Sequence, residues 1–540
     1  MSPTNTIANP KATSTAAWIT FFKSLFGAGL LSLPTVFGEV GLALGSVVYI
    51  LVTLGCTLTC YLLLESRTIA ESPEIFGLKH RCLKSEQKGL ADGLLLVRRN
   101  PPESLRYGSI PAEATALTAG TFEISNNNLV TYGDLADALL NPFMANIIRW
   151  TIIILHILFT SGLIIVIEEN MYSYSTFFSR HSLGLFLLPV ISALLQFPML
   201  QDLYMLSFLG LIVYGGGVIG STVYSAFSHM KQPDVTYNTE ETGESFGQQA
   251  AEPMELWNWS GLSTFLGSAV YALEGINLAL PTVSSMQQRQ HGAVVVCSGL
   301  LLYGFFTLFF AIVGYIGGVG GSECDVVTQC ITPMGLRHGI QLSLSLAMLV
   351  SIPIMLYPST EMLEVMLSDY IQVRKEKGNS ENYKPDPTNE RFCSDIPSTN
   401  VDGDCISSCQ TTIAQNHHNP TIYNGSEDPT KDAIPSTNSL QEHRHKKSTK
   451  LRLFLALLTT ILGTITPSFK LFSSFVGAVG LTFAGFILPP ILYISAMQKS
   501  GRTIRWYMKV ACALLFLFGF WNMFYGGFTS GRILWDNFTT

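Results

Sequence analysis

Three ionisable residues lie deep inside long apolar stretches of the chain: Lys23, His156 and Glu274. Charge is costly in hydrocarbon, so such residues are candidates for function. The carboxyl group of Glu274 either ties down unwound backbone or binds a substrate or a proton. Lys23 either extends to the membrane edge or presents an inward-facing ammonium in the place of a metal cation. His156 is either a satisfied core residue or a proton relay.

Two short motifs nearly repeat each other. Residues 31–36 read Leu-Ser-Leu-Pro-Thr-Val and residues 278–283 read Leu-Ala-Leu-Pro-Thr-Val. Helix-weakening residues precede each motif, at Gly27-Ala28-Gly29 and at Glu274-Gly275. Glycine costs about 1 kcal/mol and proline about 3 kcal/mol in a helix interior. The pattern predicts two interrupted helices whose free N–H groups suit a carboxylate, although the first glycines also fit a close helix-packing patch.

The elements that position these residues are membrane-spanning helices. The chain has 540 residues, of which 48% are hydrophobic and 13% charged, against about 25% charged in soluble domains. A hydrocarbon core about 30 Å thick requires about 20 apolar residues as helix. Eleven segments qualify: 17–37, 42–64, 147–168, 183–199, 203–227, 262–286, 293–318, 337–363, 451–468, 471–496 and 506–528. We therefore expect an all-α polytopic membrane protein, and paired interrupted segments in such a protein indicate a transporter binding site.

The distribution of lysine and arginine sets the expected orientation. With the N-terminus in the cytosol, 26 of the 32 basic residues fall on the cytosolic side, as the positive-inside rule requires. The expected regions are a cytosolic N-terminus (1–16), helices 1–2 (17–67), a cytosolic insert (68–130), helices 3–8 (131–367), a cytosolic loop (368–449), and helices 9–11 with a short non-cytosolic tail (450–540). The composition of the insert and the loop predicts that both are largely disordered.

Other motifs indicate little chemistry. Cys324 and Cys330 share a non-cytosolic loop, where the compartment permits a disulfide between them. The Cys405, Cys409, His417 and His418 cluster matches no common zinc-finger spacing, so we expect no metal site. The chain also lacks a phosphate-binding loop and an H-E-x-x-H motif. We therefore expect no cofactor, no nucleic-acid partner and no enzyme.

Several stretches together resemble the amino acid/auxin permease family, which includes proton-assisted and vacuolar amino acid transporters. They are Lys23 to Pro34, Thr131 to Leu135, Tyr271 to Pro281, Ser351 to Pro358, and Pro467 to Pro490. The resemblance implies a LeuT-like fold, with helices 1–5 and 6–10 as inverted repeats and an eleventh helix added. It implies secondary transport of amino acids across a plasma membrane or a vacuolar or lysosomal membrane.

The resemblance also assigns roles to residues. Substrate binding falls to Gly27, Ala28, Gly29, Tyr271, Glu274 and Gly275. The coupling-ion position falls to Lys23, Glu274 and Ser351, where the sodium-coupled branch has an asparagine in place of the lysine. We therefore expect proton-coupled or facilitative transport, with His156 as a candidate relay. The alternatives are an amino acid sensor on the same scaffold and a sodium-coupled symporter.

Overall fold

The structure is a computed structural model. It describes residues 12–72, 131–174, 180–196, 255–273, 275–319, 325–329, 331, 334–381 and 437–539, with scattered positions between 212 and 227. The chain divides into two units, the first being Met1–Met362 with Arg452–Thr540 and the second Leu363–Leu451. Every residue discussed below as part of the candidate site belongs to the first unit.

The described residues are mainly helical, with turns and short irregular segments between the helices and an isolated β-bridge between Ala12 and Met286. Short π-helical turns connect α16 to α17 and α18 to α19. The α-helices are α1 (Ser14–Ser24), α2 (Gly29–Val40), α3 (Leu42–Ala70), α6 (Tyr132–Leu139), α7 (Pro142–Tyr174), α8 (Arg180–Leu194), α10 (Leu262–Ala272), α11 (Ile276–Ser285), α12 (Gly292–Gly314), α13 (Met334–Glu381), α15 (Thr437–Ile465), α16 (Phe469–Val476), α17 (Leu488–Lys499), α18 (Trp506–Trp521) and α19 (Gly527–Thr539).

Among the described residues, six helices are long and apolar enough to cross a membrane, or up to seven if α1 and α2 form one bent span. The count of eleven therefore stays a prediction. One reason is that the expected sixth helix consists of two short helices, α10 and α11. Another is that α8 has only 15 residues and that segment 203–227 lies mostly outside the described residues.

Both expected interruptions are present in the structure. Helix α1 ends at Ser24, α2 begins at Gly29, and the two axes differ by 54°. Helix α10 ends at Ala272 and α11 begins at Ile276. The first break is therefore Leu25–Ala28, slightly earlier than the glycine pattern predicts. Each repeated proline sits at the sixth position of the half-helix that follows its break, Pro34 in α2 and Pro281 in α11.

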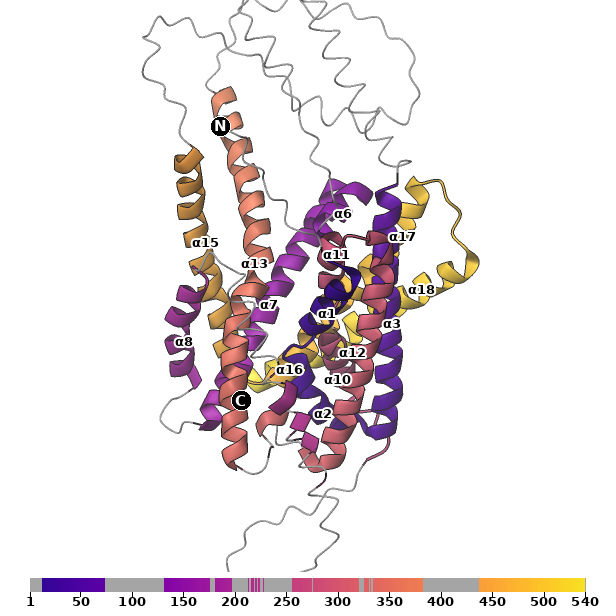
Figure 1. The fold of residues 1–540 in the computed structure, drawn as a ribbon, viewed down its shortest axis with the longest axis vertical. Helices are drawn as coiled ribbons and strands as arrows, with labels where there is room; N and C mark the ends of the chain where they lie inside the picture. Colours follow the sequence, from indigo (N-terminus) through magenta and orange to yellow (C-terminus); the bar gives the residue numbers. More distant parts are fainter. Residues whose placement is uncertain are drawn as a thin grey trace, which may run out of the picture. The chain divides into compact units, whose positions relative to one another are not determined.

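Each half of one interrupted helix packs against one half of the other. Helix α2 lies against α10, and α1 lies against α11 (Figure 1). Helix α12 contacts α1, α2 and α11, and α3 packs between α12 and α17. The breaks of the two helices therefore meet in the interior of the first unit.

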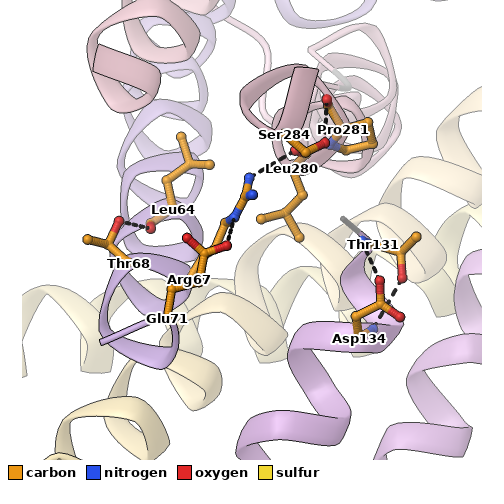
Figure 2. Close-up of polar contacts among 9 residues, drawn as sticks. All are labelled: Leu64, Arg67, Thr68, Glu71, Thr131, Asp134, Leu280, Pro281 and Ser284. Atoms are coloured by element: carbon orange, nitrogen blue, oxygen red, sulfur yellow. Dashed lines mark hydrogen bonds and ion pairs between the residues drawn. The ribbon is translucent and has the colours of Figure 1, made fainter. Parts of the chain in front are cut away.

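The short helix α6 starts with a capping box (Figure 2). The Asp134 N–H donates to the Thr131 hydroxyl at 3.2 Å, and the Thr131 N–H donates to the Asp134 carboxylate at 2.9 Å. This reciprocal pair satisfies two N–H groups that a helix start leaves without partners. The Thr131–Leu135 motif therefore forms the N-terminus of α6.

The second unit contains the C-terminal part of α13 and the N-terminal part of α15. Helix α13 continues to Glu381 and α15 already begins at Thr437. Both ends of the loop expected over 368–449 are thus helical. Residues 382–436, and residues 73–130 of the insert, lie outside the described part of the chain.

Candidate functional site

Four half-helix ends surround one cavity of about 50 Å³. Two are C-terminal ends, of α1 and α10, and two are N-terminal ends, of α2 and α11. Helices α7 and α13 complete the wall. The lining residues are Ser24, Leu25, Gly27, Ala28, Gly29, His156, Phe159, Leu163, Tyr271, Ala272, Asn277, Leu278 and Met355.

Glycine makes the close crossing of the two breaks sterically feasible. A Cβ atom on Gly29 would lie 2.8 Å from the Cα atom of Ala272, and one on Gly275 would lie 2.8 Å from Cδ2 of Leu25. Both distances are shorter than ordinary van der Waals contact, which begins at 3.4 Å. Gly29 therefore lets the backbones of α2 and α10 approach each other, and Gly275 leaves room for the side chain of Leu25.

Gly27 plays a different part from Gly29. Among the described residues, no neighbouring atom would lie within 4 Å of a Cβ atom built on Gly27, and the residue lines the cavity. Its missing side chain therefore leaves space for a ligand, whereas the missing side chain of Gly29 leaves space for helix α10. The sequence motif Gly27–Gly29 combines a pocket position and a packing position.

One wall of the cavity is aromatic. The ring of Tyr271 lies 4.9 Å from that of Phe159 and 6.0 Å from that of Phe469, measured between centroids. A Cβ atom on Gly162 would lie only 2.5 Å from the Tyr271 hydroxyl oxygen, so Gly162 makes room for this hydroxyl. Rings at these separations are typical of favourable aromatic pairs.

The backbone around the cavity is polarised. Within the described residues, the N–H groups of Ala28 and Gly29 have no hydrogen-bond acceptor, as expected at a helix start. Positive partial charge accumulates at the N-terminal ends of α2 and α11, and negative partial charge at the C-terminal ends of α1 and α10. The cavity therefore presents both signs of partial charge without a carboxylate, lysine or arginine side chain among its described lining residues, which suits a small zwitterion.

The structure gathers some of the predicted residues and leaves others aside. His156 lines the cavity, and its Nδ1 lies 2.8 Å from the carbonyl oxygen of Ile152. Lys23 and Ser351 do not line the cavity, but each lies close to a residue that does. Lys23 precedes Ser24, and Ser351 lies one helical turn before Met355. Both are half-buried, and the Ser351 hydroxyl donates to the Ala347 carbonyl at 2.9 Å.

Three predicted residues fall outside the described part of the chain: Glu274, Cys324 and Cys330. The roles assigned to them stay predictions. The neighbours of Glu274 are described: Leu273 is the C-cap residue of α10, and Gly275 is the N-cap residue of α11. The position of Glu274 in the chain is therefore within the second break.

The sequence alone did not single out Phe159 and Leu163 in the cavity wall, nor the buried Glu169 further along α7. Phe159 and Leu163 follow His156 at three and seven residues, the spacing of one helix face, so the histidine itself was the available signal. Glu169 is a buried carboxylate that accepts the N–H of Phe469 at 2.9 Å and thereby holds the N-terminus of α16. It was overlooked because the expected third helix stopped at residue 168.

The chain is similar to known amino acid transport proteins. Residues 10–75 and 118–530 match the family described as transmembrane amino acid transporter protein. The Saccharomyces cerevisiae vacuolar amino acid transporter 4 is 24% identical over 245 residues, which cover 44% of this chain and 33% of that protein. The Arabidopsis thaliana amino acid transporter AVT3C is 28% identical over 109 residues, which cover 20% of this chain and 25% of that protein.

A second yeast relative, vacuolar amino acid transporter 3, is 27% identical over 129 residues, which cover 21% of this chain and 17% of that protein. The aligned parts thus span a third or less of the length of each of these relatives. The family match, by contrast, covers most of the chain and includes every described half-helix around the cavity. The chain therefore belongs to the transmembrane amino acid transporter protein family, a family of transporters rather than of enzymes.

Proposed function

We propose that this protein is a secondary transporter that binds an amino acid in the cavity between α1, α2, α10 and α11. The observation that carries the proposal is the convergence of four half-helix ends on one cavity. The substrate α-carboxylate accepts hydrogen bonds from the N–H groups of Ala28 and Gly29. The α-ammonium group lies against the C-terminal ends of α1 and α10, where the helix dipoles favour a cation.

The size of the cavity favours small amino acids in this conformation. One water needs about 10–15 Å³ of such space, so about 50 Å³ holds a ligand of only a few heavy atoms. The apolar wall formed by Phe159, Leu163 and Met355 favours an uncharged side chain. We therefore expect small neutral amino acids to bind better than charged or bulky ones.

We further propose that transport does not require sodium and is either proton-coupled or facilitative. The proposal rests on Lys23, which is the neighbour in sequence of the cavity residue Ser24. At the position of Lys23, the sodium-coupled branch carries an asparagine. A lysine ammonium and a sodium ion 4 Å apart would repel each other by about 4 kcal/mol at an effective dielectric constant of 20. The ammonium instead supplies the positive charge that sodium would bring, with Glu274 and His156 as candidate proton carriers.

A sensor on the same scaffold is the second candidate, since long polar segments lie on the expected cytosolic side. Uptake of labelled amino acids into proteoliposomes separates the two functions, because a pure sensor binds without moving its ligand. We expect uptake of small neutral amino acids with sodium replaced by choline. Saturable binding without uptake of any amino acid, under either a proton or a sodium gradient, would favour the sensor.

A further inference from the structure

A buried arginine holds the half-helix that follows the second break. Arg67, near the end of α3, is 2% exposed, and its Nε donates to the Glu71 carboxylate at 2.9 Å. Its Nη1 donates to the main-chain carbonyl of Leu280 in α11 at 3.2 Å (Figure 2). The guanidinium therefore connects the end of α3 to the backbone of α11, one turn beyond the cavity residues Asn277 and Leu278.

The contact occurs at only one of the two repeated motifs. Leu280 and Pro281 in α11 correspond to Leu33 and Pro34 in α2. Among the described residues, no side chain donates to the carbonyl of Leu33. The structure thus adds a charged restraint to α11 that its counterpart lacks.

Helix α11 is held at a second point on the same side of the molecule. The Ala12 N–H donates to the Ser285 carbonyl at 3.0 Å, and the Gln287 N–H donates to the Ala12 carbonyl at 2.9 Å. These bonds join the segment before α1 to the end of α11. We call the side where this segment enters α1 the N-terminal face; it is the face that the lysine and arginine distribution assigns to the cytosol.

The arginine is incompletely satisfied in this conformation. Its Nη2 is buried and has no hydrogen-bond partner among the described residues. Buried donors are almost always paired, so a lone one calls for an explanation. In a permanent structural bridge, every N–H donor of the guanidinium would have a hydrogen-bond acceptor. In a contact that forms and breaks during a transport cycle, one donor can lack an acceptor in one of the states.

We propose that Arg67, oriented by Glu71, is a positioning residue that keeps α11 closed at the N-terminal face, and that its release opens the cavity to that face. The proposal rests on the transporter function proposed above. Helix α11 is suited to such movement because the break at Leu273–Gly275 separates it from α10. In addition, Pro281 removes one intrahelical hydrogen bond within it.

The test measures access to the cavity, independently of transport. Ser24→Cys places a thiol in the cavity wall, and a membrane-impermeant maleimide is applied to full-length protein in vesicles sealed with the N-terminal face outward. The same protein without the Ser24 substitution gives the background from the native cysteines. We expect Arg67→Gln and Glu71→Gln each to increase the labelling rate at least tenfold, a population shift of about 1.4 kcal/mol, and Arg67→Lys to increase it less.

A matched control removes a comparable ion pair at the other end of the span. The Lys470 ammonium lies 2.9 Å from the Glu39 carboxylate, at the end of α2. Helix α3 begins at Leu42, next to the end of α2, and Arg67 lies 25 residues further along it. At 1.5 Å per residue, about 38 Å of helix separates Arg67 from the start of α3. Lys470→Gln should therefore leave labelling from the N-terminal face unchanged.

Several results would overturn the proposal. They are an unchanged or slower labelling rate in Arg67→Gln or in Glu71→Gln, or an equal increase in Lys470→Gln, which would indicate general loosening. Both decisive variants keep a polar side chain at the altered position, and their thermal unfolding temperatures report whether they fold. Failure of either to fold would identify the contact as a structural bridge and equally contradict the proposal. Labelling that changes as expected without any amino acid uptake would contradict the transporter function alone.

Discussion

Gly27 in the first break and Gly29 at the start of α2 give a sharp prediction, because the structure assigns them different parts. In Gly29→Ala, the new Cβ atom would lie 2.8 Å from the Cα atom of Ala272, so α2 and α10 must separate by about 0.6 Å to restore contact at 3.4 Å. Overpacking of this kind costs about 1–3 kcal/mol. In Gly27→Ala, the new methyl group meets no atom of the described residues within 4 Å, so the folded state should be as stable as that of the parent.

The consequences for substrate should differ in the same way. The methyl group of Gly27→Ala occupies ligand space, and one methylene in a pocket changes discrimination by about 1–3 kcal/mol, or 10–200-fold. We expect the KM for valine and leucine to rise at least tenfold relative to that for glycine. The assays are thermal unfolding of the purified variants and uptake of glycine, alanine, valine and leucine into proteoliposomes. An unchanged preference in Gly27→Ala, or full stability in Gly29→Ala, would refute this account of the crossing.

Three further predictions follow from the site and the topology. Replacement of external sodium by choline at fixed pH should leave uptake largely intact; a large loss that an inward proton gradient does not recover would favour sodium coupling through Ser351. Glu169→Gln should lower thermal stability by about 1 kcal/mol, because it removes a negative charge from the N-terminus of α16; an unchanged unfolding temperature would contradict the capping role of this carboxylate. Tags at residues 1 and 540 should be accessible from opposite sides of the membrane, and finding both on one side would contradict the odd number of spans.

The breaks were predictable because their signals are local. Glycine and proline weaken a helix wherever they occur, so the repeated motifs indicated two interruptions without knowledge of the packing. The different parts of Gly27 and Gly29 were not predictable, since they depend on which residue faces α10. Two glycines of one motif cannot be told apart until the position of the partner helix is known.

Some residues of the site were not predictable because their residue types are common at such positions in a membrane protein. Phe159 and Leu163 are apolar residues in an apolar helix, and only their position beside His156 separates them from lipid-facing neighbours. Arg67 was counted among the basic residues of the cytosolic side, yet it is 2% exposed. Its burial depends on α11, which lies more than 200 positions later in the chain, and no local pattern encodes that contact.

In the proposed function, an amino acid binds between the two interrupted helices and is carried across the membrane. Counterflow tests it most directly, because exchange of internal unlabelled for external labelled amino acid needs no imposed ion gradient. Proteoliposomes loaded with unlabelled alanine should transiently accumulate labelled alanine, and Gly27→Phe, which fills the cavity, should abolish the accumulation while remaining folded. The absence of counterflow for every amino acid in the folded parent protein, or undiminished counterflow in Gly27→Phe, would contradict the account.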